Sequence, residues 1–131
     1  MDGEIDDVVA RWCQATVRRD SAAVADCLSD EVVLSSPISD LLQVRGRAQV
    51  RELTARAFST IESIEFHTRL DGPGHCALFA RARLNSQHLD EAVLLGLDEA
   101  GGLIREITLF IRPLSALIEL NATLTAGRKQ R

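Results

Sequence analysis

The stretch that decides the fold is IEFHTRLDGPGHCALFARARL, residues 64–84. In its first part Ile64, Phe66, Thr68 and Leu70 alternate with Glu65, His67 and Arg69. A period of two is typical of a β-strand with one buried face. The following DGPG, residues 71–74, predicts a tight turn, and the alternation then resumes, so the stretch predicts a long β-hairpin.

Apolar residues recur with one period after this hairpin and with another before it. Downstream, two more alternating segments end at Pro113, which cannot donate to a ladder. Upstream, apolar residues at helical spacing predict amphipathic helices, the first with its stripe at Ile5, Val8, Val9, Trp12, Cys13 and Thr16. The expected helices are about 4–18, 21–28, 46–60 and 114–125, and the expected strands are about 31–36, 62–70, 75–84, 88–98 and 102–112. We therefore expect one α+β domain over residues 1–131, in which helices cap a curved antiparallel sheet.

Composition excludes several classes of function. A net charge of −4 disfavours nucleic-acid binding, and no apolar run approaches the length of a membrane span. The acidic start, residues 1–4, is unlike a signal peptide, so the expected location is cytoplasmic. The three cysteines, Cys13, Cys27 and Cys76, match no metal spacing and are interpreted as small buried residues. We expect no metal and no cofactor.

Several short landmarks carry a resemblance to a known family. They are Arg18-Arg19-Asp20, Leu28 to Val33, Ser36-Pro37-Ile38, Gly46, Asp98 to Ile104 and Arg112-Pro113-Leu114. In order and spacing the chain resembles the nuclear transport factor 2-like superfamily, and its ending is most similar to the SnoaL-like members. The resemblance implies a cone-shaped sheet, a cystatin-like α+β barrel with an apolar pocket, and homodimers formed through the sheet face.

The catalytic positions of two enzymes in that superfamily are substituted here. Ketosteroid isomerases place a basic aspartate, a tyrosine and a protonated aspartic acid at positions that correspond to Ser36, Trp12 and Val93. The chain has no tyrosine at all. The epoxide hydrolases' arginine-x-aspartate falls near Arg81 and Arg83, which puts a second cation where a carboxylate is needed. The resemblance therefore leaves open whether the protein is an enzyme.

Glu91 is the main candidate for a catalytic group. If Val93 faces the pocket, strand alternation turns Glu91 inward as well, onto an apolar face. Desolvation would raise its pKa toward the range used in acid–base catalysis, whereas the alternative is an ion pair with a rim arginine. The same comparison turns Glu106, Thr108 and Phe110 inward on the last strand. In the opposite register Glu106 is a solvated cross-strand partner.

The remaining candidates have simpler alternatives. Trp12 is either ordinary core or a pocket wall whose N–H orients a ligand oxygen. His67 lies in the polar register of its strand and is expected at the surface. His75 and His88 could meet across a hairpin, but they lack a third metal ligand.

Three functions follow. The first is a binding module for a small apolar molecule. Its pocket would be lined by Trp12, Val32, Leu34, Ser36, Leu78, Ala80, Val93 and Leu95, together with Glu106, Thr108 and Phe110. The second is an isomerase, cyclase or hydrolase that uses Glu91 as acid or base. The third is a dimeric interaction subunit, marked by exposed Leu94, Leu109 and Ile111 on the outer sheet face.

Overall fold

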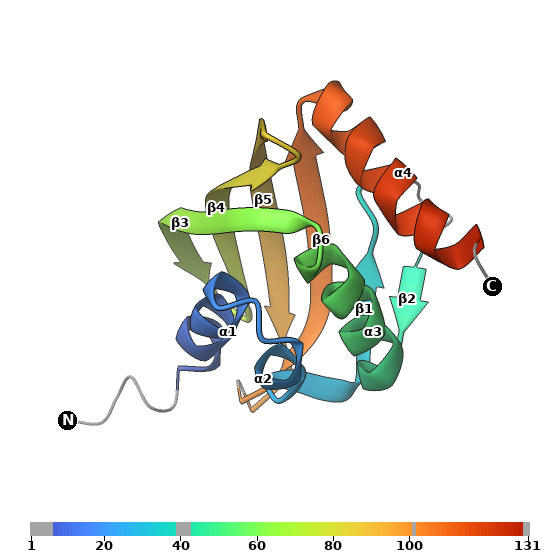
Figure 1. Ribbon diagram of the computed structural model, residues 1–131. Coiled ribbons are helices and arrows are strands. Elements are labelled where there is room, and N and C mark those ends of the chain that lie inside the picture. The colour runs from blue at the N-terminus through green and yellow to red at the C-terminus, as the bar shows by residue number, and fades with distance from the viewer. Residues whose placement is uncertain (1–6, 39–42, 101, 130–131) are drawn as a thin grey trace.

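Helices cover one face of a curved sheet in the computed structural model, which describes residues 7–38, 43–100 and 102–129, with side chains as far as Leu124 (Figure 1). The helices are α1 (Val8–Val17), α2 (Ser21–Ala25), α3 (Arg47–Phe58) and α4 (Leu114–Lys129). The strands are β1 (Leu28–Ser35), β2 (Gln43–Arg45), β3 (Ile61–Gly72), β4 (His75–Leu84), β5 (Gln87–Leu97) and β6 (Ile104–Arg112). The predicted α+β class is confirmed. The expected first turn of α1, residues 4–6, lies outside the described residues.

Capping side chains fix where the first two helices begin. Asp7 precedes α1, and its Oδ1 accepts hydrogen bonds of 3.1 Å from the backbone N–H groups of Val9 and Ala10. Asp20 precedes α2 and accepts from the N–H of Ala23 at 3.0 Å. Each cap satisfies backbone donors that have no partner within the helix. Asp7 also forms an ion pair of 2.9 Å with Arg69 on β3, which ties the start of α1 to the sheet.

The sheet has six strands in the order β2-β1-β6-β5-β4-β3. Every neighbouring pair is antiparallel except β1 and β6, which run parallel, so the expectation of a wholly antiparallel sheet is wrong at this one pairing. The sheet does not close, and β3 crosses in front of the other strands in Figure 1 because the sheet is strongly curved. The short strand β2 lies in a segment that the sequence predicts as loop, residues 38–45.

A bulge in β6 reverses the expected orientation of that strand. Ile104 is buried, Arg105 and Glu106 are both exposed, and Ile107 is buried again, with a register shift against β5 between Gly96 and Leu97. Two successive residues thus face solvent, and all later positions change face. The prediction that Glu106, Thr108 and Phe110 face inward is wrong, because Glu106 is exposed and Phe110 is 55% exposed. The opposite prediction, that Leu109 and Ile111 are exposed on the outer face, is wrong for the same reason.

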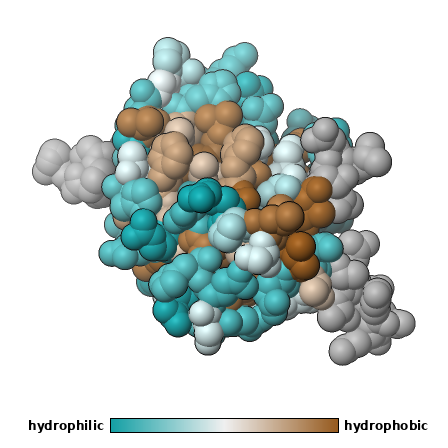
Figure 2. Space-filling view, turned by 90° about the horizontal axis from the view of Figure 1, so that it is seen from above, coloured by the Kyte–Doolittle hydropathy of each residue, from teal (hydrophilic) through white to brown (hydrophobic). Residues whose placement is uncertain are grey.

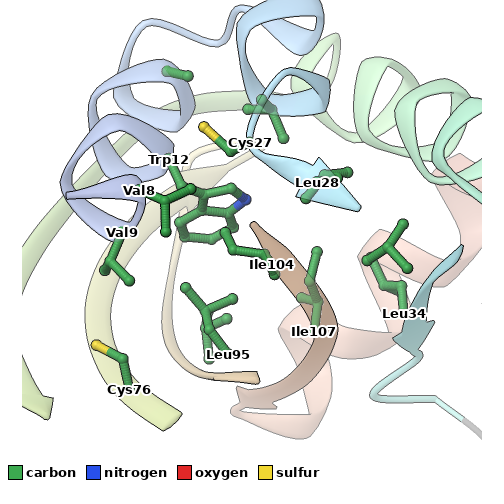
Figure 3. Packing of buried hydrophobic residues seen from close by; sticks show 14 of the residues in the cluster. Val8, Val9, Trp12, Cys27, Leu28, Leu34, Cys76, Leu95, Ile104 and Ile107 are labelled. Atoms are coloured by element: carbon green, nitrogen blue, oxygen red, sulfur yellow. The ribbon is translucent and has the colours of Figure 1, made fainter. Parts of the chain in front are cut away.

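The core lies between the helices and the concave face of the sheet. Figure 3 shows the indole of Trp12 between α1 and the sheet residues Leu95 and Ile104. Leu95 and Ile104 are completely buried. A second cluster under α4 contains Ala116 and Leu120, packed against the far ends of β3, β4 and β5. The core therefore has one part beneath the first two helices and another beneath the last.

Some apolar side chains remain on the surface. Figure 2 shows hydrophobic residues gathered in patches between hydrophilic ones on the face seen from above. The largest exposed apolar side chains include Leu70, Leu94, Phe110, Leu114 and Ile118. In the part of the chain that the structure describes, no helix is long and apolar enough to cross a membrane.

Candidate functional site

A cavity of about 240 Å³ lies between the concave face of the sheet and the helices. The strands contribute mainly Leu34, Val44, Ile61, Ile64, Ile107 and Leu109 to its wall. The helices contribute mainly Trp12, Val24, Leu53, Ala57, Phe58, Leu120 and Leu124. Because nearly all of these side chains are aliphatic or aromatic, the cavity can exclude water from most of a small molecule.

Glu91 is the only acidic residue among the described residues that line this cavity. It lies on β5 between Leu89 and Val93, which are both buried, and its cross-strand neighbours are Ala80 and Ile111. Its carboxyl group has no hydrogen bond or ion pair with any described residue, so the alternative of a rim-arginine ion pair is not realised there. Burial raises the pKa of Glu91 from 4.5 to about 7. Near neutral pH this carboxyl can therefore either donate or accept a proton.

Trp12 forms part of the wall from α1. It is 6% exposed, and its indole Nε1 is buried without a hydrogen-bond partner among the described residues. The ring packs at an angle of 58° against Phe66, with 5.9 Å between the ring centroids. In Figure 3 the indole nitrogen lies on the Leu28 side of the ring, away from Val8. A buried N–H without an acceptor costs free energy, so this donor is one that a ligand oxygen could satisfy.

Polar residues other than Glu91 also line the cavity, namely Thr16, Ser36, Thr54, Arg56 and Asn121. The Arg56 side chain is 36% exposed and also lines the cavity, which places it where the cavity meets solvent. Its Nε, like the Trp12 nitrogen, is buried and has no partner among the described residues. The Ser36 Oγ accepts a hydrogen bond of 3.0 Å from the N–H of Ile38, and its own proton is free to turn toward a ligand.

The structure brings only some of the expected pocket residues to the cavity. Trp12, Leu34, Ser36 and Glu91 line it. The other expected inward residues, Val32, Leu78, Ala80, Val93 and Leu95, are buried but fill the core instead.

Sequence reasoning missed the contributions of α3 and α4. Arg56 is the clearest case, because it follows Leu53 by three residues and precedes Ala57. Residues three and four apart share one side of a helix, so Arg56 is a cation on an apolar stripe. That spacing is the signal that could have identified it. Leu120 and Leu124 show the same four-residue spacing on α4.

Other candidate chemistry is weak. Burial raises the pKa of both Cys13 and Cys76 to about 11, so neither thiol is an activated nucleophile. Arg81 and Arg83 approach Asp90 and Glu62 at 3.5 and 3.6 Å, and they lie on the side of β4 opposite the core. His67 is exposed. Among the described parts of the chain, no three His, Cys, Asp or Glu residues lie close enough together to hold a metal ion.

Comparisons with solved structures show the same architecture. An uncharacterised bacterial protein with a cystatin-like fold from Silicibacter pomeroyi DSS-3 superposes with a TM-score of 0.87 at 17% identity, covering 93% of this chain and 85% of its own. A steroid delta-isomerase from Pseudomonas aeruginosa gives 0.82 at 22% identity, covering 94% and 88%. A de novo designed protein with a curved β-sheet gives 0.72 at 15% identity, covering 91% and 96%. At these identities the likeness shows the fold alone.

Comparisons of the sequence identify the family. No curated protein matches the chain. The family model of the SnoaL-like domain matches residues 9–94, which extend from α1 into β5 and contain both Trp12 and Glu91. The match covers more than half of the sequence and agrees with the curved sheet and its helical cover, so the chain belongs to the SnoaL-like domain family.

Proposed function

We propose that this protein binds a small, largely apolar molecule in the cavity between the sheet and the helices. One observation carries the proposal: the Glu91 carboxyl group lies unpaired on the wall of a cavity whose lining is mainly apolar. The Glu91 side chain is half-buried, and no described residue pairs with its carboxyl group. A partly desolvated carboxyl without a partner is costly to fold around, which is the arrangement found where a polar group serves a ligand.

The size of the cavity supports a ligand rather than a trapped solvent molecule. Apolar cavities of about 150 Å³ stay dry and bind benzene. At about 240 Å³ the present cavity can hold a somewhat larger hydrocarbon body. The best occupant is therefore a compact ring system or short chain that carries one or two oxygen atoms for Glu91 and Trp12.

The test uses 2-decalone, an uncharged bicyclic ketone, as the probe. Trp12 is the only tryptophan of the chain, and the chain has no tyrosine, so intrinsic fluorescence reports on the cavity wall directly. We expect 2-decalone to change this fluorescence saturably and to raise the midpoint of thermal unfolding. Absence of both effects at the solubility limit of the ketone would contradict the proposal.

Two glutamate variants show whether the probe occupies this cavity. Glu91→Gln changes a wall residue and should alter the affinity for 2-decalone. Glu106→Gln changes an exposed residue on the next strand and should leave the affinity as it is. Equal effects of the two variants would place the probe elsewhere.

A second candidate function is acid–base catalysis by Glu91. Its raised pKa of about 7 is close to the operating pH that favours proton transfer, and a structurally similar protein is a steroid delta-isomerase. Catalysis would show as faster exchange of the protons next to the carbonyl of 2-decalone in deuterium oxide, followed by proton NMR. Glu91→Gln should abolish the acceleration while the protein stays folded, and an unchanged exchange rate would exclude this role.

We also propose that two copies associate through the outer sheet face, on which Leu94 and Phe110 are 39% and 55% exposed. Leu94 is paired with Thr108, and Phe110 with Ala92, so the two side chains belong to adjacent strands. Monomers rarely leave such apolar groups uncovered together. Light scattering should give a dimer mass that Phe110→Asp converts to a monomer mass. A monomer mass for the unaltered protein at micromolar concentration would exclude this association.

A further inference from the structure

Arg56 is an unassigned polar group at the edge of the cavity, and its guanidinium is poorly satisfied by the protein. Its only ion pair among the described residues is with Glu52, four residues earlier on α3, at 4.0 Å between Nη1 and Oε2. That distance is the outer limit for such a pair, and the Glu52 side chain is 74% exposed. Exposed pairs of this kind contribute little to stability. Glu52 therefore does not account for the position of Arg56.

The unsatisfied atoms of the protein converge on the same place. In the described part of the chain, the buried side-chain nitrogen and oxygen atoms without a hydrogen-bond partner are Trp12 Nε1 and Arg56 Nε. Both residues line the cavity, although one belongs to α1 and the other to α3. Both atoms are donors. An occupant that supplies acceptor oxygens would satisfy two groups that the protein leaves unsatisfied.

The geometry of the Arg56 guanidinium indicates which kind of acceptor group it would bind. Its Nη1 is directed to Glu52, so the edge formed by Nε–H and Nη2 remains for another partner. Two parallel N–H donors on one edge match the two oxygens of a carboxylate. Arg56 is also the only cation among the described residues that line the cavity. Because it lies where the cavity meets solvent, a carboxylate bound there would stay partly hydrated while its apolar body enters the cavity.

We infer that the cavity takes an apolar monocarboxylate, with its carboxylate on the Nε–H edge of Arg56 and its hydrocarbon part among the side chains of α3, α4 and the sheet. This inference rests on the proposed function, since it assumes that the cavity is a ligand site. It adds an anionic head group and names the residue that holds it.

The test compares octanoate with octanol, which share a chain and differ in the head group. Binding is measured by calorimetry and by Trp12 fluorescence at neutral pH. A charge-assisted pair of hydrogen bonds should make octanoate bind about tenfold or more tightly than octanol. Arg56→Gln keeps much of the stem but removes the charge and the edge, so it should weaken octanoate binding far more than octanol binding and abolish the preference.

Two further variants make the comparison specific. Arg51→Gln removes an exposed arginine of the same helix that does not line the cavity, and it should keep the preference for octanoate. Arg56→Lys keeps the charge but not the two-donor edge, so it should retain only part of the preference. If Arg56→Gln does not fold, Arg56→Lys decides the question.

The outcomes separate the two proposals. Equal binding of octanoate and octanol by the unaltered protein, or a preference that survives Arg56→Gln, would overturn the role of Arg56. If 2-decalone binds and neither octyl compound does, the carboxylate ligand is wrong and the cavity remains a ligand site. If none of the three compounds binds, both proposals fail.

Discussion

Replacing Glu91 by glutamine should make the stability of the protein respond differently to pH. Glutamine is close to glutamate in size and cannot ionise, so Glu91→Gln removes the titration and keeps most of the packing. In the unaltered protein Glu91 has a pKa of about 7, whereas an unperturbed glutamate carboxyl has a pKa of 4.5. The folded state therefore binds this proton more tightly than the unfolded state does.

The sign and size of the effect follow from that difference. Below the pKa that Glu91 has in the unfolded protein, the carboxyl is protonated in both states and does not reduce the free energy of unfolding. Between the two pKa values only the unfolded state ionises, so the stability of the unaltered protein falls as the pH rises. Above the folded pKa the full penalty remains, about 3 kcal/mol for this shift.

Urea unfolding followed by Trp12 fluorescence can measure this penalty, at about pH 4 and again at about pH 8.5. The difference in unfolding free energy between Glu91→Gln and the unaltered protein should grow by about 3 kcal/mol in favour of the variant over that range. Glu106→Gln, on the exposed side of β6, serves as the control and should show a small difference that does not depend on pH. A Glu91→Gln difference that stays constant with pH would refute the assignment of Glu91 as an unpaired, half-buried carboxyl whose pKa is raised by desolvation.

Three further predictions concern the fold. Leu95→Ala, at a completely buried position, should lower the free energy of unfolding by about 2–5 kcal/mol in urea titrations, whereas Leu70→Ala, at a position that is 58% exposed, should change it by less than about 0.5. Asp7→Ala should lower the free energy of unfolding by about 1 kcal/mol, because the α1 cap is lost. Asp7→Asn should lower it by less. Because Arg69 lowers the pKa of Asp7 and the ion pair is lost once that carboxyl is protonated, the difference between Asp7→Asn and the unaltered protein should vanish in thermal melts at acid pH. Gly96→Ala places a Cβ 2.7 Å from Glu106 Oε1 and should lower the melting temperature, with recovery in the Gly96→Ala, Glu106→Ala double variant if that contact is the cause.

Sequence patterns predict most of this fold because burial and local geometry act together in its long elements. The hairpin of β3 and β4 combines strict alternation with a DGPG turn, in which Gly74 has a φ of +70° that suits glycine. The inward direction of Glu91 follows from the same alternation along β5. From His75 to Leu84 one register pairs β4 with β5, so a short apolar pattern is sufficient there. In β3 the register shifts between Phe66 and Thr68, and Leu70 beyond the shift is 58% exposed rather than buried.

The errors arise where a distant contact decides the structure. The bulge at Arg105 and Glu106 depends on how β6 meets β5 near Gly96, and β6 is amphipathic enough to allow either face inward. The spacing of Arg56 on α3 places it on the apolar side of that helix, but that α4 lines the same cavity follows from a tertiary contact that no local pattern shows. The volume of the cavity is the volume that the backbone encloses minus the volume of the side chains that fill it. No local sequence pattern predicts that difference.

The position of α4 has a consequence for folding as well as for binding. Leu120 and Leu124 form one side of the cavity, while Trp12 and Glu91 face it from α1 and β5, so the first and last helices border the same incompletely filled interior. An occupant would complete the hydrophobic contacts of the C-terminal helix in the way that a missing core side chain would. At a concentration of 100 times its dissociation constant it would add about 2.7 kcal/mol to the free energy of unfolding. Protection of the α4 amides from hydrogen exchange would then report how much of the protein is occupied.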